Sequence, residues 1–351
     1  MEMDELLEEL VLREASDLHL RIGEPPIYRL AGHLVRSEFP VVTEEDTKKL
    51  LYSIMSEERQ KKFERELELD MSYGIPGISR FRVNVFKQRG AVGAALRVIP
   101  LRIKTIDEWG LPQILKELCL LPRGLVLVTG PTGSGKSTTL AAMVEHINRF
   151  RRAHLITIED PIEFIHKDNL ACIEQRELGS DTHSFAASLK HVIRQNPDVI
   201  MVGEMRDFET MSLAISAAET GHLVLATLHT TDAAQTVDRI INAFPPEGQA
   251  QARLQLSSTL QAVISQALLP ALDGKRLVAA FEIMVCTSAM RSVIREGKTP
   301  QIYSLIQAGA KYGMQNLDQS LKEIYLRGLV SYEDALAKSS NPQEFEQSVM
   351  R

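Results

Sequence analysis

A glycine-rich segment at residues 130–138 (GPTGSGKST) combines residue types that bind phosphate groups. It follows the apolar run 125–128 and leads into Lys136-Ser137, so it predicts a strand, a tight turn and a helix start. Backbone N–H groups and the helix N-terminus of such a turn form a cradle for the β- and γ-phosphates of a nucleotide. Lys136 adds a positive charge, and the Ser137 hydroxyl is placed to ligand Mg²⁺. The predicted nucleotide-binding residues are Gly130, Pro131, Thr132, Gly133, Ser134, Gly135, Lys136, Ser137 and Thr138.

Acidic and histidine side chains follow three further apolar runs. The runs cover residues 154–158, 199–202 and 223–227, and they predict buried strands of a parallel sheet that also contains residues 125–129. Ligands of open parallel sheets bind beyond the carboxyl ends of the strands, so the residues after each run are candidates for the site. These are Glu159, Asp160 and Glu163 after the first run, Glu204 after the second and His229 after the third.

Glu204 is the main candidate to hold or polarise the water that attacks the γ-phosphate. Glu163 is a second candidate from the neighbouring strand, and either carboxylate is also suited to hold Mg²⁺ through water. The alternative for each is a solvated loop residue. Asp198 lies six residues before Glu204. That is roughly 20 Å along an extended strand, so we expect a turn or capping role for Asp198.

Two histidines bracket the run 223–227. His222 and His229 have no third ligand near them and lie at opposite ends of the predicted strand, so a metal pair is not favoured. His229 lies at the site end, and we expect it to hydrogen-bond to a phosphate or to Glu204. For His222, a structural and a functional role are equally compatible with the sequence.

Arginines matter because phosphoryl transfer develops charge that a guanidinium stabilises. Arg80 and Arg82 share one face of a predicted strand by period two, and Arg97 lies on the next strand. From spacing alone, we interpret them as solvated charges across a small sheet. Three other arginines have ordinary surface explanations on helices or loops, namely Arg194, Arg206 and Arg239.

These elements predict an α/β protein with a small N-terminal α+β domain. After Leu111, apolar strands alternate with amphipathic helices, which is typical of a parallel sheet. Beyond residues 244–246 we expect a mostly helical chain to the end. The N-terminal domain is predicted to contain a helix that begins near Thr43, a turn at 88–90, a linker at 99–104, and strands over 17–22, 80–85 and 91–99.

The composition is that of an ordinary globular protein, with 351 residues, 44% of them hydrophobic and 25% charged. A net charge of −6 provides no basic field, so no nucleic acid partner is expected. Three widely spaced cysteines, Cys119, Cys172 and Cys286, indicate a reducing compartment. The acidic N-terminus has no signal-peptide pattern and no run is long enough to span a membrane, so we expect a cytoplasmic protein with membrane association only through a partner.

The ordered set of motifs resembles that of the type II/IV secretion ATPase superfamily, most closely its PilT-like retraction motors of type IV pili. The resemblance runs nearly end to end. In residues 289–298, the retraction subgroup usually has Ile-Arg-Asn where this chain has Met290-Arg291-Ser292. The matching segments are ASDLHLRIGEPPIYRLAGHL (15–34), RFRVNVFKQRG (80–90), GPTGSGKSTTL (130–140), ITIEDPIEF (156–164), DVIMVGEMRD (198–207), TGHLVLATLHT (220–230) and AMRSVIREGK (289–298).

This resemblance implies both a fold and roles for particular residues. It implies a PAS-like domain over residues 1–100, a linker over 101–110, a RecA-like ATPase core over 111–270 and a mostly helical region over 271–351. Glu204 and Glu163 match the family's catalytic acids, and His222 and His229 match its histidine motif. Arg82 and Arg97 match the arginines that reach the γ-phosphate, which changes their interpretation from solvated charges to site residues.

The resemblance further implies a homohexamer that hydrolyses ATP with Mg²⁺ and acts on an inner-membrane platform protein during pilus retraction. The hexamer would then be a peripheral protein at the inner membrane. Other pilus ATPases are further candidate partners. By this resemblance, we expect the chain to begin almost directly at the PAS-like domain, without the N-terminal module common in assembly and type II secretion ATPases, which favours a retraction motor. The alternatives are an assembly or secretion motor, a nucleic-acid translocase and a nucleotide-gated adaptor that barely hydrolyses ATP.

Overall fold

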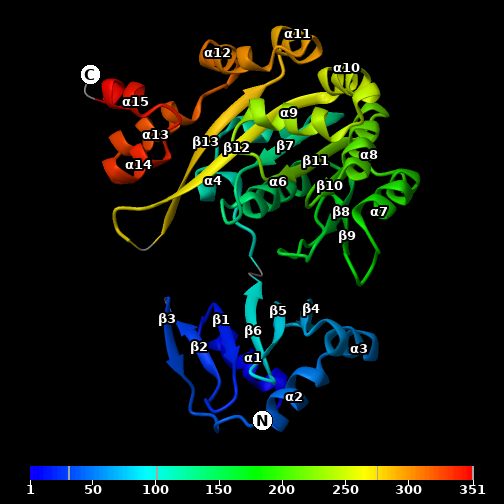
Figure 1. The fold of residues 1–351 in the computed structure, drawn as a ribbon, viewed down its shortest axis with the longest axis vertical. Helices are drawn as coiled ribbons and strands as arrows, with labels where there is room; N and C mark the ends of the chain where they lie inside the picture. The colour runs from blue at the N-terminus through cyan, green and yellow to red at the C-terminus, as the bar shows by residue number, and fades with distance from the viewer. Residues whose placement is uncertain (31, 100–101, 275, 350–351) are drawn as a thin grey trace. The chain divides into compact units, whose positions relative to one another are not determined.

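The computed structural model describes residues 1–30, 32–99, 102–274 and 276–349 and divides into two compact units (Figure 1). The first unit contains Met1–Ile103 together with Pro161–Ile165. The second contains Lys104–Asp160 and His166–Arg351. Pro100 and Leu101, which belong to the predicted linker, lie outside the described residues. The rest of the predicted linker includes the short helix α4 (Ile106–Trp109).

Within its described residues, the first unit is an antiparallel sheet with strand order β3-β2-β1-β6-β5-β4. Its helices bury apolar side chains such as Leu6 and Phe63 in one core with inward residues of the sheet such as Phe81. The elements are α1 (Met3–Leu12), β1 (Asp17–Leu20), β2 (Ile27–Leu30), β3 (His33–Arg36), α2 (Glu44–Ser53), α3 (Glu57–Glu66), β4 (Glu68–Ile75), β5 (Ser79–Gln88) and β6 (Ala91–Ile99).

The β5–β6 hairpin places two arginines opposite each other. Its turn is Arg89-Gly90, and both residues have positive φ, 53° and 85°, as a tight two-residue hairpin requires. The resulting register pairs Arg82 with Arg97. Phe81 and Val83 are buried in the core, so alternation directs Arg82 to the other face of the sheet. The predicted strands, the turn at 88–90 and the Thr43 helix cap are confirmed.

The second unit is a sheet with strand order β13-β12-β7-β11-β10-β8-β9. All neighbouring strands are parallel except the β12–β13 hairpin. The predicted strands are confirmed to within a residue at each end. The strands are β7 (Gly124–Thr129), β8 (His154–Glu159), β9 (Cys172–Glu177), β10 (Val199–Val202), β11 (Leu223–Leu228), β12 (Leu260–Pro270) and β13 (Leu277–Val285).

Helices cover both faces of this sheet. Along β7, Leu125 and Leu127 belong to the apolar core under α7–α12, whereas Val126 and Val128 belong to the core under α4–α6. Burial on both faces explains why the central strands are continuously apolar. The helices are α5 (Ile114–Cys119), α6 (Lys136–Phe150), α7 (Phe185–Val192), α8 (Phe208–Glu219), α9 (Ala233–Ala243), α10 (Gln249–Thr259), α11 (Ser288–Glu296) and α12 (Ile302–Gln307).

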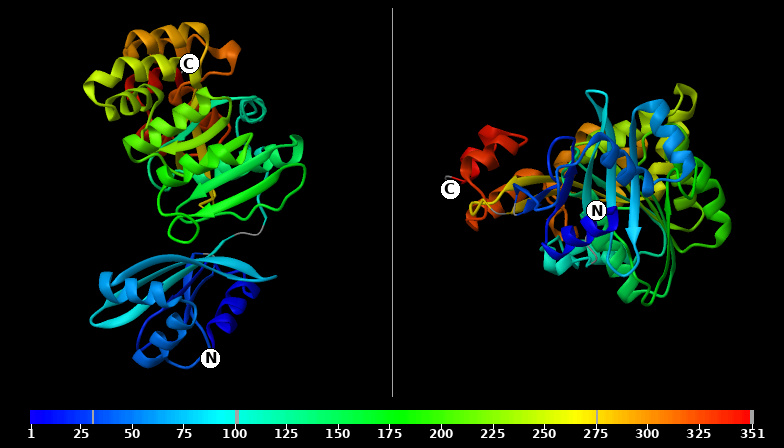
Figure 2. Two further views of the ribbon diagram at one scale, coloured as in Figure 1. Left: turned by 90° about the vertical axis from the view of Figure 1, so that its right-hand side faces the viewer. Right: turned by 90° about the horizontal axis from the view of Figure 1, so that it is seen from below.

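The prediction of a mostly helical chain beyond residue 246 is wrong for the β12–β13 hairpin. Its strands are buried on both faces along most of their length, so they lack the alternation of a half-buried strand and their apolar period does not distinguish them from a buried helix. The C-terminal helices are α13 (Leu317–Leu326), α14 (Tyr332–Lys338) and α15 (Pro342–Val349), drawn in red tones near the hairpin in Figures 1 and 2. Their buried side chains form a separate apolar cluster with Leu269 and Ala280 of the hairpin.

The α/β class predicted from the sequence is confirmed, with a small α+β unit before a larger parallel-sheet unit. None of the helices in the described ranges has the length and apolar character needed to cross a membrane.

Candidate active site

The phosphate-binding loop lies between β7 and α6, as the sequence predicts. Gly130, Gly133 and Gly135 have φ of 143°, 78° and 87°, a region that side chains other than glycine rarely adopt. A Cβ atom on Gly130 would lie 2.4 Å from the backbone oxygen of Gln266, and one on Gly135 would lie 2.7 Å from the Gln266 Nε2. The loop therefore needs glycine at two positions for space as well as for conformation.

The helix that follows the loop has an N-terminus suited to an anion. Gly135 is its cap residue and provides no side-chain cap, whereas Asp207 and Asp232 cap α8 and α9 by accepting from Thr210 and Gln235 N–H groups. The first N–H groups of a helix have no partner within the helix. Because α6 lacks a capping carboxylate, its first turn suits a phosphate, and the residues present fit the predicted nucleotide.

Lys136 is the first residue of α6, and its side chain is buried against the start of the loop. Its Nζ donates to the carbonyl oxygens of Gly130 at 2.8 Å and Pro131 at 3.0 Å. The same Nζ lies 3.5 Å from Nδ1 of His229. The charge predicted to contact the phosphates is thus held inside the cradle and adjoins the residue that follows β11.

Glu204 and His229 meet at the carboxyl ends of β10 and β11. Nε2 of His229 lies 2.9 Å from Oε1 of Glu204, and Arg206 donates to Oε2 of Glu204 at 2.8 Å. With the Nε2 hydrogen on His229, its Nδ1 is free to accept from Lys136, so the three side chains form one connected series. The predicted contact between His229 and Glu204 is present, and the catalytic roles of both residues stay predictions.

The charges around Glu204 keep its carboxylate ionised. Burial by itself raises the pKa of Glu204, but the hydrogen bond and charge of Arg206, together with His229, outweigh it and hold the pKa below the ordinary 4.5. An ionised carboxylate accepts hydrogen bonds at about four lone-pair sites, so Glu204 retains capacity to accept from a water. This is the state that a group polarising an attacking water requires.

Two hydrogen bonds between Thr227 of β11 and the loop after β10 fix the position of Glu204. The Thr227 hydroxyl donates to the Gly203 carbonyl at 2.5 Å, and the Met205 N–H donates to the Thr227 carbonyl at 3.0 Å. Thr227 is almost fully buried. One residue near the end of β11 therefore clamps both neighbours of Glu204.

The residue predicted to ligand Mg²⁺ directly is Ser137, a half-buried residue in the first turn of α6. Within the ranges that the structure describes, no group of three or more His, Cys, Asp or Glu side chains could hold a metal ion. Mg²⁺ in nucleotide sites usually takes one or two protein oxygens, with phosphates and waters completing its shell. The hydroxyl of Ser137 fits that pattern.

The arginines and Glu163 belong to the first unit. Arg82 donates to Glu163 Oε1 at 3.3 Å, and the Arg97 Nε donates to Asp17 Oδ1 at 2.8 Å. Like charges directly across a sheet repel, and these two arginines bind different carboxylates. Asp17 also forms an ion pair with Arg29 at 3.2 Å. Burial raises the pKa of Asp17, but hydrogen bonds from Ser16 and Arg97 outweigh this and lower it. The roles of Arg82, Arg97 and Glu163 in catalysis stay predictions.

Two polar residues lie at the opposite ends of the same strands. His222 precedes β11, and its Nδ1 lies 2.9 Å from the Ala217 carbonyl at the end of α8. Asp198 precedes β10, and its Oδ2 accepts from the His154 N–H at 2.8 Å, which confirms the expected structural role. His222 is thus away from the loop along β11, and the functional role implied for it by resemblance stays a prediction.

Sequence reasoning missed three residues that shape the site. Arg206 was interpreted as a surface charge, although it pairs with Glu204. Its position two residues after the acid was the available signal, because both lie in the same short loop. Thr227 and Gln266 gave no signal, since their partners are remote in the sequence.

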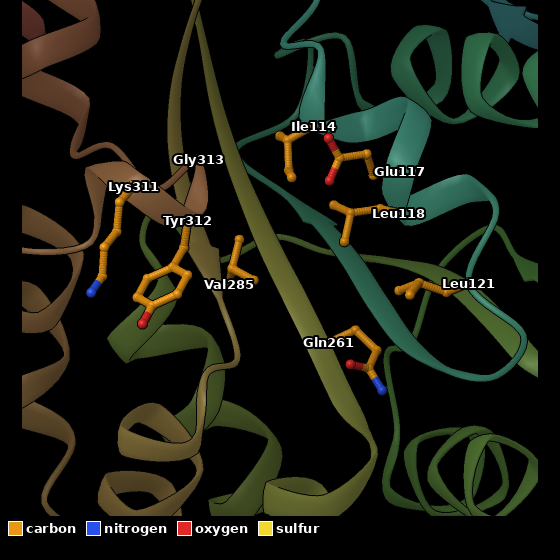
Figure 3. Close-up of a pocket in the computed structure, with 9 residues that line it drawn as sticks. All are labelled: Ile114, Glu117, Leu118, Leu121, Gln261, Val285, Lys311, Tyr312 and Gly313. Carbon is orange, nitrogen blue, oxygen red and sulfur yellow. The ribbon is translucent and has the colours of Figure 1, made fainter.

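A cavity of about 530 Å³ lies near the amino ends of the parallel strands, away from the loop. Figure 3 shows the residues that line it. It is lined by α5, by Gln261 and Val285 of the β12–β13 hairpin, and by the turn containing Lys311 and Tyr312. Lys311 points away from the cavity, with its Nζ 4.9 Å from the centre of the Tyr312 ring. The lining lacks convergent charged groups, which distinguishes it from the loop site.

Comparisons with known proteins agree with this geometry. The family described as type II/IV secretion system protein matches residues 2–337. The type IV pilus retraction ATPase PilT of Pseudomonas aeruginosa is 49% identical, covering 98% of this chain and 100% of that protein. A twitching motility protein of Neisseria gonorrhoeae is 46% identical, covering 91% of this chain and 85% of that protein.

A solved structure matches the fold as well. A crystal structure of the pilus retraction motor PilT with bound ADP superposes with a TM-score of 0.91 at 47% identity, covering 99% of both chains. The N-terminal domain and the ATPase domain of the predicted fold are both included in that match. The chain therefore belongs to the type II/IV secretion system protein family, and its enzyme class is that of a P-loop ATPase.

Proposed function

We propose that this ATPase powers the retraction of type IV pili. The observation that carries the ATPase part is the connected series Lys136, His229 and Glu204 beside the phosphate-binding loop. The retraction part is supported by the similarity, over nearly its whole length, to a protein named as a pilus retraction ATPase. An assembly or secretion motor with the same chemistry is the competing proposal, because the family includes secretion proteins.

In the proposed reaction, the loop N–H groups and Lys136 bind the β- and γ-phosphates and neutralise charge as the γ-phosphoryl group is transferred. Ser137 would hold Mg²⁺, which would supply further neutralisation of the phosphate charge when bound. Glu204 accepts a hydrogen bond from the attacking water and orients it. His229 binds the Glu204 carboxylate through one ring nitrogen and contacts Lys136 through the other. A change in the position of Lys136 on phosphate binding would therefore change the position of Glu204.

Arg82 and Arg97 are proposed to reach the γ-phosphate from the N-terminal domain, with Glu163 as a second acid. Their ion pairs with Glu163 and Asp17 would then be exchanged for contacts with ATP, and hydrolysis would reverse the exchange. A homohexamer in which such changes pass from chain to chain would act on a platform protein of the inner membrane. The protein would be cytoplasmic and bound to the membrane through that partner, with other pilus ATPases as further partners.

The test is a count of surface pili by electron microscopy on cells that lack the gene. Abundant or overlong pili on cells that cannot move by twitching are the expected result. Return of the gene should restore movement, and return of the Glu204→Gln variant should not. Bald cells would instead support an assembly motor. ATP turnover by the purified protein that rises with added DNA would support a translocase, and negligible turnover would support an adaptor.

A further inference from the structure

Gln266 of β12 lies directly beneath the phosphate-binding loop, although it is remote from the loop in sequence. It follows Ser265, which pairs with Thr129 at the end of β7, so the parallel register brings it level with Gly130. It shares a strand face with Ile264, which packs in the core under α6. Its side chain is 4% exposed. A buried carboxamide at this position needs partners for both of its polar atoms.

Both polar atoms bind the segment that contains the loop. Nε2 of Gln266 donates to the Ser134 carbonyl at 2.6 Å, and Oε1 accepts from the Thr139 hydroxyl at 2.8 Å. Thr139 is 1% exposed and lies in the first turns of α6. One side chain therefore ties the middle of the loop to the helix that follows it.

The bond to Ser134 has a consequence for the phosphate cradle. The carbonyl of Ser134 and the N–H of Gly135 belong to one trans peptide plane, in which the two groups point in opposite directions. Holding the carbonyl toward Gln266 therefore holds the Gly135 N–H on the other side of that plane, away from β12. Without the Gln266 amide, this peptide plane would lose its buried partner and would be free to rotate.

The position of Gln266 explains why glycine is needed at two positions of the loop. A Cβ on Gly130 would meet the backbone oxygen of Gln266 at 2.4 Å, and one on Gly135 would meet its Nε2 at 2.7 Å. The loop and residue 266 are thus packed too closely for any side chain at these two positions. This close packing is consistent with β12 setting the backbone conformation of the phosphate-binding loop.

We propose that Gln266 is a positioning residue that holds the phosphate-binding loop in its nucleotide-binding conformation, acting through the Ser134–Gly135 peptide and Thr139. It does not touch the nucleotide in this proposal. Its loss should therefore weaken nucleotide binding more than it slows the chemical step. The inference rests on ATP binding by the loop and is independent of the direction in which the motor works.

The test is Gln266→Leu in the full-length protein, because leucine keeps the approximate volume and removes both hydrogen bonds. We expect the KM for ATP and the Kd for ADP to rise by about tenfold, as the loss of a buried hydrogen-bond pair implies. The kcat at saturating ATP should stay within about threefold of wild type, because Lys136 and Glu204 are unchanged. Phosphate release and calorimetric titration with ADP measure these quantities.

The matched control is Ser265→Ala on the same strand. Ser265 accepts a buried hydrogen bond from Thr129 at 2.9 Å and has no bond to Ser134 or Thr139 among those described. This variant should lower the melting temperature without changing the KM. An equal rise in KM in Ser265→Ala would overturn the proposal, because the effect would then follow from stability alone.

A second pair of variants tests the proposal even if the Gln266→Leu protein does not fold. Thr139→Val deletes only the hydroxyl that anchors Gln266, so the KM should rise by a few fold, and Thr139→Ser should restore it. A wild-type KM in a folded Gln266→Leu protein overturns the proposal. If Gln266→Leu does not fold, a wild-type KM in Thr139→Val overturns it, and a raised KM that Thr139→Ser reverses supports it.

Discussion

The central strands β7, β10 and β11 carry similar residues at their two ends, but these residues are connected differently. We call the ends that precede the strands the amino edge and the ends that follow them the carboxyl edge. Both edges have a glycine with positive φ beside a glutamine of β12, an acid next to β10 and a histidine next to β11. The four at the amino edge are Gly124, Gln261, Asp198 and His222, and the four at the carboxyl edge are Gly130, Gln266, Glu204 and His229.

At the amino edge, each polar side chain binds a different neighbour. Asp198 accepts a backbone N–H, His222 lies against a backbone carbonyl, and Gln261 accepts from Arg291, which also binds two backbone carbonyls. At the carboxyl edge, Lys136, His229 and Glu204 are bound to one another. At the carboxyl edge, the connected side chains include a lysine, a histidine and a carboxylate, which are groups that can exchange protons or ionic partners during a reaction.

The direction of the chain explains which edge carries the site. In parallel β–α units, each helix begins beyond the carboxyl end of its strand, so α6, α8 and α9 all present their N-termini at that edge. Helix N-termini favour negative charge. The carboxyl edge therefore suits both the phosphates of a nucleotide and an ionised Glu204, and the same residue types at the amino edge lack this environment.

The largest expected effect comes from the lysine at the carboxyl edge. Lys136→Ala should abolish nucleotide binding or lower kcat/KM for ATP by about a thousandfold or more, because it removes the charge inside the cradle. Lys311→Ala, in the cavity lining at the other edge, is the control and should leave turnover unchanged. Phosphate release measures both. Turnover by Lys136→Ala within tenfold of wild type would contradict the assignment of the nucleotide site to the carboxyl edge.

The next effect comes from the acids beside β10. Glu204→Gln should leave ATP binding close to wild type and lower kcat by about a hundredfold to a thousandfold, because the amide does not polarise water as a carboxylate does. Asp198→Asn, at the amino edge, should bind and hydrolyse ATP normally. Single-turnover hydrolysis and ADP titration separate the two steps. Wild-type turnover by Glu204→Gln would show that its assigned role is wrong.

A buried acid on β13 gives the carboxyl edge a pH-dependent stability. Oε1 of Glu282 accepts the Ala233 N–H at 2.8 Å, and burial raises the pKa of Glu282 from 4.5 to about 7. That value is the balance of four contributions, because the charges of Asp232 and Asp318 also raise the pKa and the Ala233 N–H lowers it. Between these two values, the folded protein retains a proton that the unfolded chain has lost. The free energy of unfolding should therefore fall as the pH rises through this window.

Glu282→Gln removes that ionisation. Relative to wild type, this variant should become more stable as the pH is raised from about 5 to about 8, by up to about 3 kcal/mol. Urea unfolding of both proteins at the two pH values measures the difference. An identical difference at both pH values would show that Glu282 does not titrate in this window.

The smallest expected effect separates the two histidines. His229→Ala should lower kcat about tenfold, because Glu204 loses one of its two partners, while the protein stays folded. His222→Ala should leave kcat unchanged and lower the free energy of unfolding by about 1 kcal/mol through loss of one hydrogen bond. Loss of turnover in a folded His222→Ala protein would instead support the functional role implied by resemblance, and the edges would not differ as described.

The sequence alone determined the elements whose signals are local. The phosphate-binding loop, the four parallel strands and the acids and histidine that follow them are each visible within about ten residues, because period and turn chemistry are short-range properties. The order of motifs was enough to predict the family. The β12–β13 hairpin was missed, since its continuous apolar pattern fits a buried helix equally well.

Only the tertiary structure decided which side chains meet. The pairing of Arg206 with Glu204 depended on the path of one short loop, and the clamp by Thr227 depended on the register of two strands. Gln266 binds Ser134 and Thr139 across separations of 132 and 127 residues. No local pattern encodes such contacts, because they exist only once the sheet has brought β12 beside β7 and set both in register.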